Sequence, residues 1–239
     1  MTSLLIYETI VPLQKDKHAG LYLEPINNNY EFTRNTAIMP LLAAEFPFAS
    51  KDYPIAFVES GDELTPVAIL GVEGNNSFLQ PDGSWKATYI PAFARRYPFV
   101  YSSSQQGDQY AVCIDETYPG FNRHGAGEIV VNHDGSTTPL LEKTIEFMKE
   151  YEKLSSLTRN FCGKIQGLNL LETKSIRFSG PHGENVGLSG ILIVNNDRLQ
   201  ELDADHLVDL MRTGTLDLIY EHIHSMRNLQ EIAKHLAAQ

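Results

Sequence analysis

Residues 85–99 gather side chains that can recognise a ligand. This stretch holds the single tryptophan of the chain, two adjacent arginines and four further aromatic residues. Guanidinium groups flanked by rings can bind a carboxylate, or stack on a sugar or an indole ring. We therefore predict a binding site for a small-molecule or peptide ligand of anionic or aromatic character. The residues expected to form it are Trp85, Tyr89, Arg95, Arg96 and Tyr97.

The same stretch also has a structural interpretation. Its rings can belong to the hydrophobic core, and its arginines can form ion pairs with acidic residues elsewhere in the chain. The stretch itself carries three basic side chains and no acidic one, although the chain as a whole is acidic. The net charge of the protein therefore does not exclude a small anion as the ligand.

Two residues outside this stretch are candidates for acid–base catalysis. Glu45 lies between Ala44 and Phe46, and apolar neighbours can tune a carboxylate for proton transfer. His18 directly precedes an expected strand. An enzyme would need both side chains within hydrogen-bond reach of each other and of Arg95 around a cleft. A partnered structural glutamate and a structural histidine are the simpler interpretations.

Other catalytic patterns are missing from the sequence. His222 and His224 are two positions apart on an expected helix, so they point to different faces. Cys113 and Cys162 lie far apart without metal or redox spacing, and we expect both to be buried thiols. No nucleophile elbow occurs, and the glycine-rich loop 180–187 lacks a lysine and a following helix. The sequence predicts no metal and no cofactor, and it favours a non-catalytic binding protein over an enzyme.

Composition excludes several classes of partner. The 239 residues include 30 acidic and 19 basic side chains, which gives a formal net charge of −11. Such a charge disfavours nucleic acids and anionic lipid surfaces. No run approaches the ~18 consecutive apolar residues of a membrane span, and the N-terminus does not resemble a secretory signal. We expect a soluble, cytoplasmic protein.

Hydrophobic patterning predicts an α+β fold. Short apolar runs bounded by Gly, Pro and Asn indicate strands, and those near residues 55 and 67 are apolar enough to be covered on both faces. Residues 81–83 are expected to form a hairpin turn. The expected strands are residues 4–13, 20–24, 54–59, 66–72, 77–80, 99–103, 109–115, 174–178 and 188–195.

Capping residues locate the helices. Thr138 and Pro139 are expected as N-cap and first residue of a long helix that ends near Gly167. A short helix is expected between Pro40 and Pro47. Two more follow near the C-terminus, one capped by Asp203 and ending at Gly214, the next capped by Thr215.

These elements predict one architecture: a mostly antiparallel sheet, then the long helix, a further strand pair and a helical C-terminus. The whole chain, residues 1–239, is expected to form a single domain. Within it, residues 1–137 are a strand-rich lobe and residues 138–239 a helix-rich lobe.

Two sets of residues also form a recognisable pattern. The first comprises residues 53–57, 66–71, 76–78, 83–85 and the block 89–99, which ends in Arg-Arg-Tyr-Pro-Phe. The second comprises residues 192–199 and 214–228. These segments resemble the signature stretch and the closing strand and helices of the SapC family of bacterial proteins. The resemblance covers about residues 7–229.

The resemblance implies an accessory role in nutrient uptake or metabolism, because family members tend to be encoded near TonB-dependent receptors and halogenase-like proteins. It carries over no catalytic residues. The family is named after a protein linked to a surface layer, so a self-associating surface-layer component stays an alternative, as does an enzyme of unrecorded mechanism. A protein partner or a homo-oligomer is compatible with each interpretation. The label of peptide-transport permease, given to some members, does not fit a chain without an apolar span.

Overall fold

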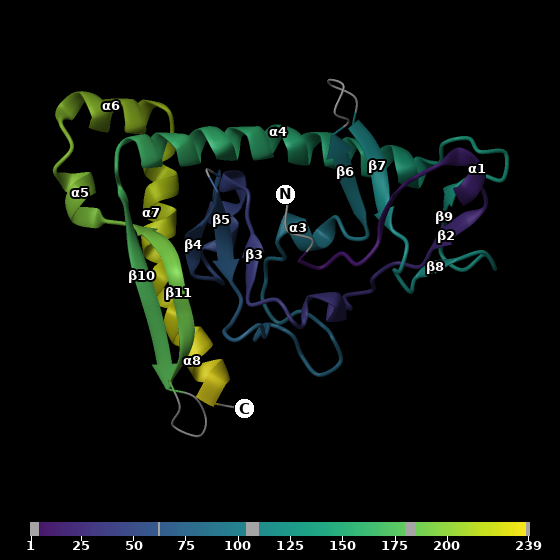
Figure 1. Ribbon diagram of the computed structural model, residues 1–239, viewed down its shortest axis with the longest axis horizontal. Coiled ribbons are helices and arrows are strands. Elements are labelled where there is room, and N and C mark those ends of the chain that lie inside the picture. Colours follow the sequence, from purple (N-terminus) through teal and green to yellow (C-terminus); the bar gives the residue numbers. More distant parts are fainter. Residues whose placement is uncertain (1–4, 62, 104–109, 180–184, 238–239) are drawn as a thin grey trace.

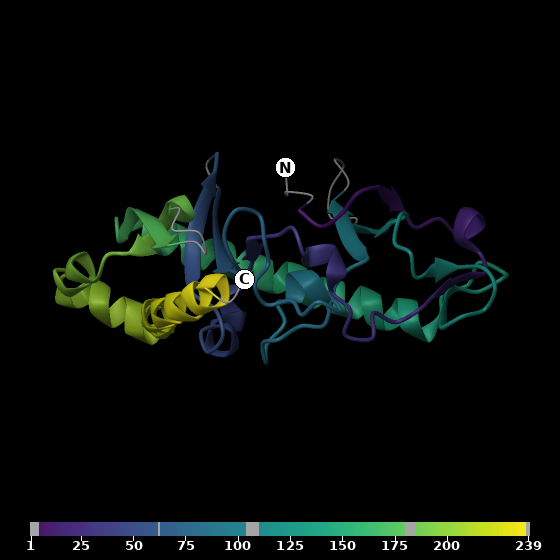
Figure 2. The ribbon, with the colours of Figure 1, turned by 90° about the horizontal axis from the view of Figure 1, so that it is seen from below.

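A computed structural model describes residues 5–61, 63–103, 110–179 and 185–237 of the chain. It has the expected α+β fold, with antiparallel sheets, a long helix after the first of them and a helical C-terminus. The long helix α4 (Pro139–Gly167) runs along most of the molecule, with the largest sheet at one end and two small sheets toward the other (Figure 1). Figure 2 shows the same separation from below.

Helix α4 begins and ends where the capping residues predict. The Thr138 side chain accepts a hydrogen bond from the Leu141 amide at 3.1 Å, and Pro139 occupies the first turn, where no amide donor is needed. The 29 residues of the helix bury one stripe that includes Met148, Phe161 and Ile165. The helix thereby contacts elements from both ends of the molecule.

The largest sheet has the strand order β10-β11-β4-β5-β3. Helix α7 packs against β4 and β11, and helix α8 packs against β10. Ile55, Ala56 and Phe57 of β4 are fully buried, as the continuous apolar run predicts. The bounds are β3 (Ile38–Pro40), β4 (Ile55–Ser60), β5 (Glu63–Ile69), β10 (Leu171–Ser179), β11 (Asn185–Val194), α7 (Thr215–Ser225) and α8 (Leu229–Ala237).

Two three-stranded sheets lie toward the N-terminal end of α4 (Figure 1). One has the order β1-β7-β6, and the other has the order β8-β2-β9. The first two strands belong to different sheets, since β1 pairs with β7 whereas β2 pairs with β8 and β9. The bounds are β1 (Ile10–Pro12), β2 (Leu21–Leu23), β6 (Phe99–Ser103), β7 (Tyr110–Asp115), β8 (Phe121–Asn122) and β9 (Glu128–Val131).

Short helices lie in the segments between the strands and the longer helices. They comprise α1 (Lys15–His18), η1 (Glu31–Thr33), η2 (Ala43–Glu45), α2 (Phe46–Ala49), α3 (Ala92–Arg95), α5 (Asn196–Gln200), α6 (Ala204–Arg212) and η3 (Met226–Asn228). Asp203 caps α6 as expected, because its carboxylate accepts the His206 amide at 2.9 Å. None of the helices among the described residues combines the length and the apolar character that crossing a membrane requires.

Several boundaries differ from the sequence-based prediction. Pro40 does not start a helix but ends strand β3, where it lies opposite Val67. Helical structure begins three residues later with η2 and continues past Pro47 in α2. Residues 77–80 form no strand, because their only ladder contact is the isolated bridge from Leu79 to Trp85. That bridge closes the predicted turn at 81–83. Thr215 is the first residue of α7 rather than its cap.

The loop between strands β10 and β11 lies largely outside the described residues. Strands β10 and β11 pair antiparallel up to Ser179 and Asn185, as a hairpin requires. Residues 180–184, which include most of the predicted glycine-rich loop, are outside the described part of the chain. Both cysteines are buried and free, as predicted, and burial raises the pKa of the Cys162 thiol to about 12.

Candidate functional site

A cavity of about 310 Å³ opens where η2, α2 and the segment before α3 meet the middle of α4. We call it the Arg95 cavity. Its walls are mainly apolar and aromatic, and its polar side chains include Glu45, Tyr89 and Arg95. The structure therefore brings together three of the residues that the sequence singled out. The apolar walls include Leu42, Phe48, Phe147, Tyr151 and Leu154.

Glu45 is at the base of this arrangement and is only 5% exposed. One carboxylate oxygen, Oε1, accepts hydrogen bonds from the Tyr89 hydroxyl and from the Ala92 amide, both at 2.7 Å. The other oxygen, Oε2, accepts the Leu42 amide at 2.8 Å. Glu45 thus joins the start of η2 to the start of α3, which corresponds to the partnered structural glutamate among the alternatives.

Tyr89 links the carboxylate to the cavity wall. Its ring stacks on Phe48, with centroids 5.7 Å apart, and its hydroxyl donates to Glu45. Burial, and next the charge of Glu45, raise the pKa of Tyr89 well above its usual range. The phenol therefore stays protonated at neutral pH and serves as a donor.

Arg95 is exposed and lies on two rings. Its guanidinium carbon is 5.8 Å from the ring centroids of both Tyr89 and Phe147. Its Nε donates to the Ile90 carbonyl at 2.9 Å, and Nη2 makes a long contact of 3.4 Å with the Tyr89 hydroxyl. Nη1 has no hydrogen-bond partner among the described residues. The outer edge of the guanidinium is therefore accessible.

Arg96 is only 6% exposed and is surrounded by rings. Its guanidinium carbon is 4.3 Å from the Phe93 centroid and 4.6 Å from that of Tyr151, and its Nε donates to the Tyr7 hydroxyl at 3.2 Å. Within the described residues neither arginine forms an ion pair. The structural alternative was therefore right about core aromatics but wrong about pairing with acids.

A second cavity of about 370 Å³ adjoins the first, and we call it the Lys143 cavity. Arg95 and Phe147 line both cavities, so they form the boundary between them. The Lys143 cavity is lined by three basic residues, Lys143, Arg95 and Arg96, against a single acidic one, Glu24. Basic side chains therefore outnumber acidic ones in the lining of the Lys143 cavity.

Trp85 and Tyr97 do not line the same cavity. Trp85 is buried in the main core, where its Nε1 donates to the Tyr53 hydroxyl at 2.7 Å, and it lines neither cavity. Tyr97 stacks on Phe32 with centroids 4.2 Å apart and contributes to the Lys143 cavity. The structure therefore groups Tyr89, Arg95, Arg96 and Tyr97 around the two cavities, but not Trp85.

His18 is separate from this region. It ends α1, which lies at the end of the molecule beside β2 and β9 (Figure 1). It is buried, burial lowers its pKa, and its Nδ1 accepts the Gln14 amide at 2.8 Å. It lines neither cavity and shares no hydrogen-bond partner with Glu45. Glu45 and Arg95 line the same cavity and both contact the Tyr89 hydroxyl, whereas His18 lies elsewhere, so the three groups that the enzyme hypothesis requires do not converge.

Sequence reasoning missed the wall that α4 contributes. Phe147, Tyr151 and Leu154 lie at three- and four-residue steps on one face of α4 and line the Arg95 cavity. No local signal indicates which part of that face borders a cavity rather than the core. No group of three or more His, Cys, Asp or Glu side chains in the described residues is arranged to hold a metal ion.

Comparison with known proteins gives one match. No curated protein and no solved structure shows significant similarity to this chain. The protein-family model SapC matches residues 13–232, which is nearly the whole chain. The matched range includes the Arg95 and Lys143 cavities and every predicted site residue. On this evidence of sequence, the chain belongs to the SapC family.

Proposed function

We propose that this protein is a non-catalytic binding protein that holds a small molecule or peptide segment in the Arg95 cavity. The ligand has an apolar or aromatic body inside the cavity and an anionic group on Arg95. One observation carries the proposal: Arg95 is exposed at the boundary of two cavities and has no carboxylate partner among the described residues. An accessory role in uptake or metabolism belongs to the same proposal and rests on the family resemblance alone.

The position of Arg95 supports recognition of a carboxylate. The Ile90 carbonyl accepts a hydrogen bond from Nε of Arg95 and thereby fixes the orientation of the guanidinium. Nη1 and Nη2 form the outer edge of the guanidinium. Such an edge can donate two parallel hydrogen bonds to one carboxylate. The rings of Tyr89 and Phe147 lie under the guanidinium and restrict its movement.

The bonding of Glu45 supports binding rather than catalysis. A general base needs a lone pair directed at the substrate, but both oxygens of Glu45 accept hydrogen bonds from the protein itself. Abstracting a proton would weaken the bonds that hold η2 against α3. We therefore assign Glu45 to the construction of the cavity.

The proposal can be tested with phenylacetate and its uncharged counterpart phenylacetamide, by isothermal titration calorimetry. We expect saturable binding of phenylacetate, and at least ~10-fold weaker binding after Arg95→Met, because a charge-assisted hydrogen bond contributes about 1.5–3 kcal/mol. Phenylacetamide should bind the wild type and the variant equally. Arg212→Met, an exposed change on α6, is the matched control and should leave both affinities unchanged. Equal phenylacetate affinity of wild type and Arg95→Met would contradict the proposal.

A further inference from the structure

A third cavity lies between the C-terminal helix α8 and the loop that follows β5, and it shares no lining residue with the Arg95 cavity. Its volume is about 290 Å³, and we call it the His235 cavity. In contrast to the Arg95 cavity, its walls are mainly polar. Arg34, Lys86, Ser77, Asn75 and His235 line it, and none of the carboxylates in the described residues does.

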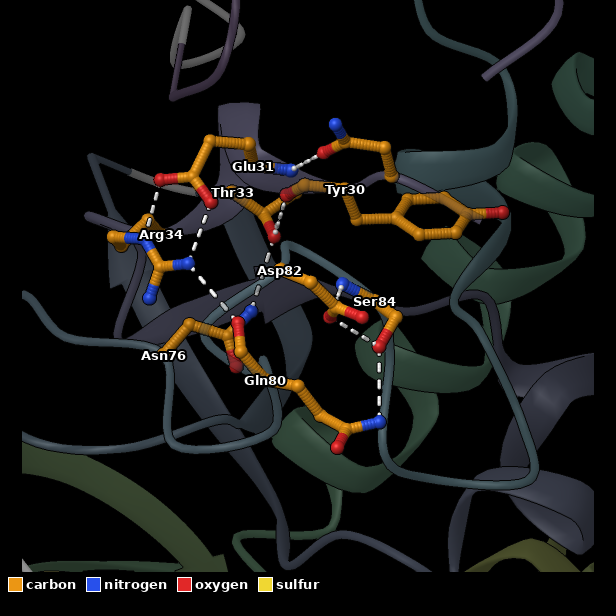
Figure 3. A network of polar contacts seen from close by, with 9 residues as sticks. Tyr30, Glu31, Thr33, Arg34, Asn76, Gln80, Asp82 and Ser84 are labelled. Atoms are coloured by element: carbon orange, nitrogen blue, oxygen red, sulfur yellow. Dashed lines mark hydrogen bonds and ion pairs between the residues drawn. The ribbon is translucent and has the colours of Figure 1, made fainter. Parts of the chain in front are cut away.

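Hydrogen bonds hold one wall of this cavity in place, as Figure 3 shows. Arg34 donates to the Glu31 carboxylate through Nε and Nη2, and Nη2 also reaches the Gln80 carbonyl at 3.1 Å. Asn76 donates to the Thr33 hydroxyl at 3.1 Å, and that hydroxyl donates to the Tyr30 carbonyl at 2.8 Å. The Nη1 group of Arg34 has no partner among the described residues. A positioned guanidinium thus retains free donor capacity beside the cavity.

Two buried polar atoms of the lining have no hydrogen-bond partner in the described part of the chain. They are the Ser77 hydroxyl, in a residue only 4% exposed, and Nδ1 of His235. An unpaired polar atom in the interior destabilises the folded state, so such atoms are rare in folded proteins and call for an explanation. Both of them are in side chains that line the same cavity, although Ser77 and His235 are far apart in the sequence.

Lys86 adds a positive charge at the mouth. It is exposed, and its Nζ makes only a long contact of 3.4 Å with the Ser77 carbonyl. Burial, and next the charge of Lys86, lower the pKa of His235, so its ring is neutral at pH 7. Phe78 packs edge-on against that ring, and Glu231 and Lys234 act on it from its own helix.

We propose that the His235 cavity binds the phosphoryl group of a small phosphorylated molecule. Lys86 and Arg34 supply charge-assisted donors, and the Ser77 hydroxyl and the His235 ring supply neutral ones. These donors come from separate segments, so they suit a group whose oxygens point in several directions better than a planar carboxylate. The volume is close to the lower end for small-molecule pockets and leaves room for a body beyond the phosphate.

The test uses inorganic phosphate as the probe on the full chain. Isothermal titration calorimetry measures the affinity, and NMR of the His235 imidazole nitrogens reports on the cavity itself. We expect saturable binding, at least ~10-fold weaker after Lys86→Gln and several-fold weaker after Ser77→Ala. Phosphate should shift the His235 nitrogens in the wild type, and less in both variants. Because a merely structural role of Ser77 would not change this signal, the NMR readout separates the two interpretations.

The control Lys17→Gln removes another exposed lysine at the opposite end of the molecule, where Lys17 pairs with Glu116. It should leave phosphate affinity and the shift of the His235 nitrogens unchanged. Absence of saturable phosphate binding would overturn the proposal. Equal loss in Lys17→Gln and Lys86→Gln would also overturn it, because it would indicate general charge attraction. Acetate shifting the His235 nitrogens as strongly as phosphate does would refute the phosphoryl assignment.

Discussion

The Arg95 cavity and the His235 cavity distribute their hydrogen bonds in opposite ways. Around the Arg95 cavity the buried polar groups bond to one another: Glu45 accepts from Tyr89 and from two backbone amides, and the walls are otherwise apolar. Around the His235 cavity the walls are polar, and the Ser77 hydroxyl and a ring nitrogen of His235 are left without partners.

The difference separates side chains that build a cavity from side chains that can bind within it. A buried carboxylate whose oxygens are all occupied holds the structure together, and its removal should affect stability. A buried hydroxyl without a partner does not stabilise the fold, and its removal should weaken ligand binding without lowering stability. Variants of matched residues test this difference.

Glu45→Ala should have the largest effect. The change leaves the Leu42 and Ala92 amides and the Tyr89 hydroxyl without their acceptor in the interior, which should lower the free energy of unfolding by about 3–4 kcal/mol. Urea unfolding followed by circular dichroism measures this. Glu150→Ala, in an exposed residue of the same cavity that pairs with Lys153, should cost no more than about 0.5 kcal/mol. Equal costs for the two variants would contradict the structural role of Glu45.

Protonation of His222 should have the next largest effect on the free energy of unfolding. This effect appears only when the pH is lowered. This residue of α7 is fully partnered: its Nε2 accepts the Val194 amide at 3.0 Å, so Nδ1 carries the proton and donates to the Ile55 carbonyl at 2.8 Å. Burial lowers the pKa of His222 to about 4, from 6.5 in the unfolded chain. The folded state therefore excludes a proton that the unfolded state accepts.

The stability that the neutral His222 ring contributes is fully present above pH 6.5 and is lost as the pH falls toward 4. At ~1.4 kcal/mol per pKa unit, the loss should reach about 3 kcal/mol. Unfolding in urea between pH 7 and pH 4 tests this, with His222→Gln expected to show a shallower decline than the wild type. His206→Gln, in an exposed position, should keep the full decline. A decline of the same slope in His222→Gln would show that other groups cause it.

Features encoded by neighbouring residues were predictable from the sequence. The start of α4 needs only Thr138 and Pro139, and both of its ends match the prediction. The prediction that Pro40 starts a helix is wrong, because proline is compatible with an edge strand as well as with the first turn of a helix. The pairing of β3 with β5, opposite Val67, decides between them, and no local pattern encodes it.

The candidate sites show the same limit. Tyr89 and Arg95 are near neighbours in the sequence, so their composition marks them as one block. Their link to Glu45 spans 44 positions, and only the fold establishes it. Trp85 was predicted to bind ligand because of its type, but its indole nitrogen bonds to Tyr53 in the core. The cavity that joins Ser77 to His235 left no signal in the sequence, because these two residues are far apart in the chain.

Ser77→Ala should have the smallest destabilising effect of these changes. In phosphate-free buffer, removing a buried hydroxyl that makes no hydrogen bond should not lower the free energy of unfolding and should raise it by up to about 1–3 kcal/mol, since the penalty of its burial disappears with it. Thr33→Val is the matched control, because the hydroxyl of Thr33 is equally buried near the same wall but donates to Tyr30 and accepts from Asn76 (Figure 3). Its loss should cost about 1–3 kcal/mol. Equal costs, measured by urea unfolding, would mean that the Ser77 hydroxyl stabilises the fold, and its role would then be that of Glu45.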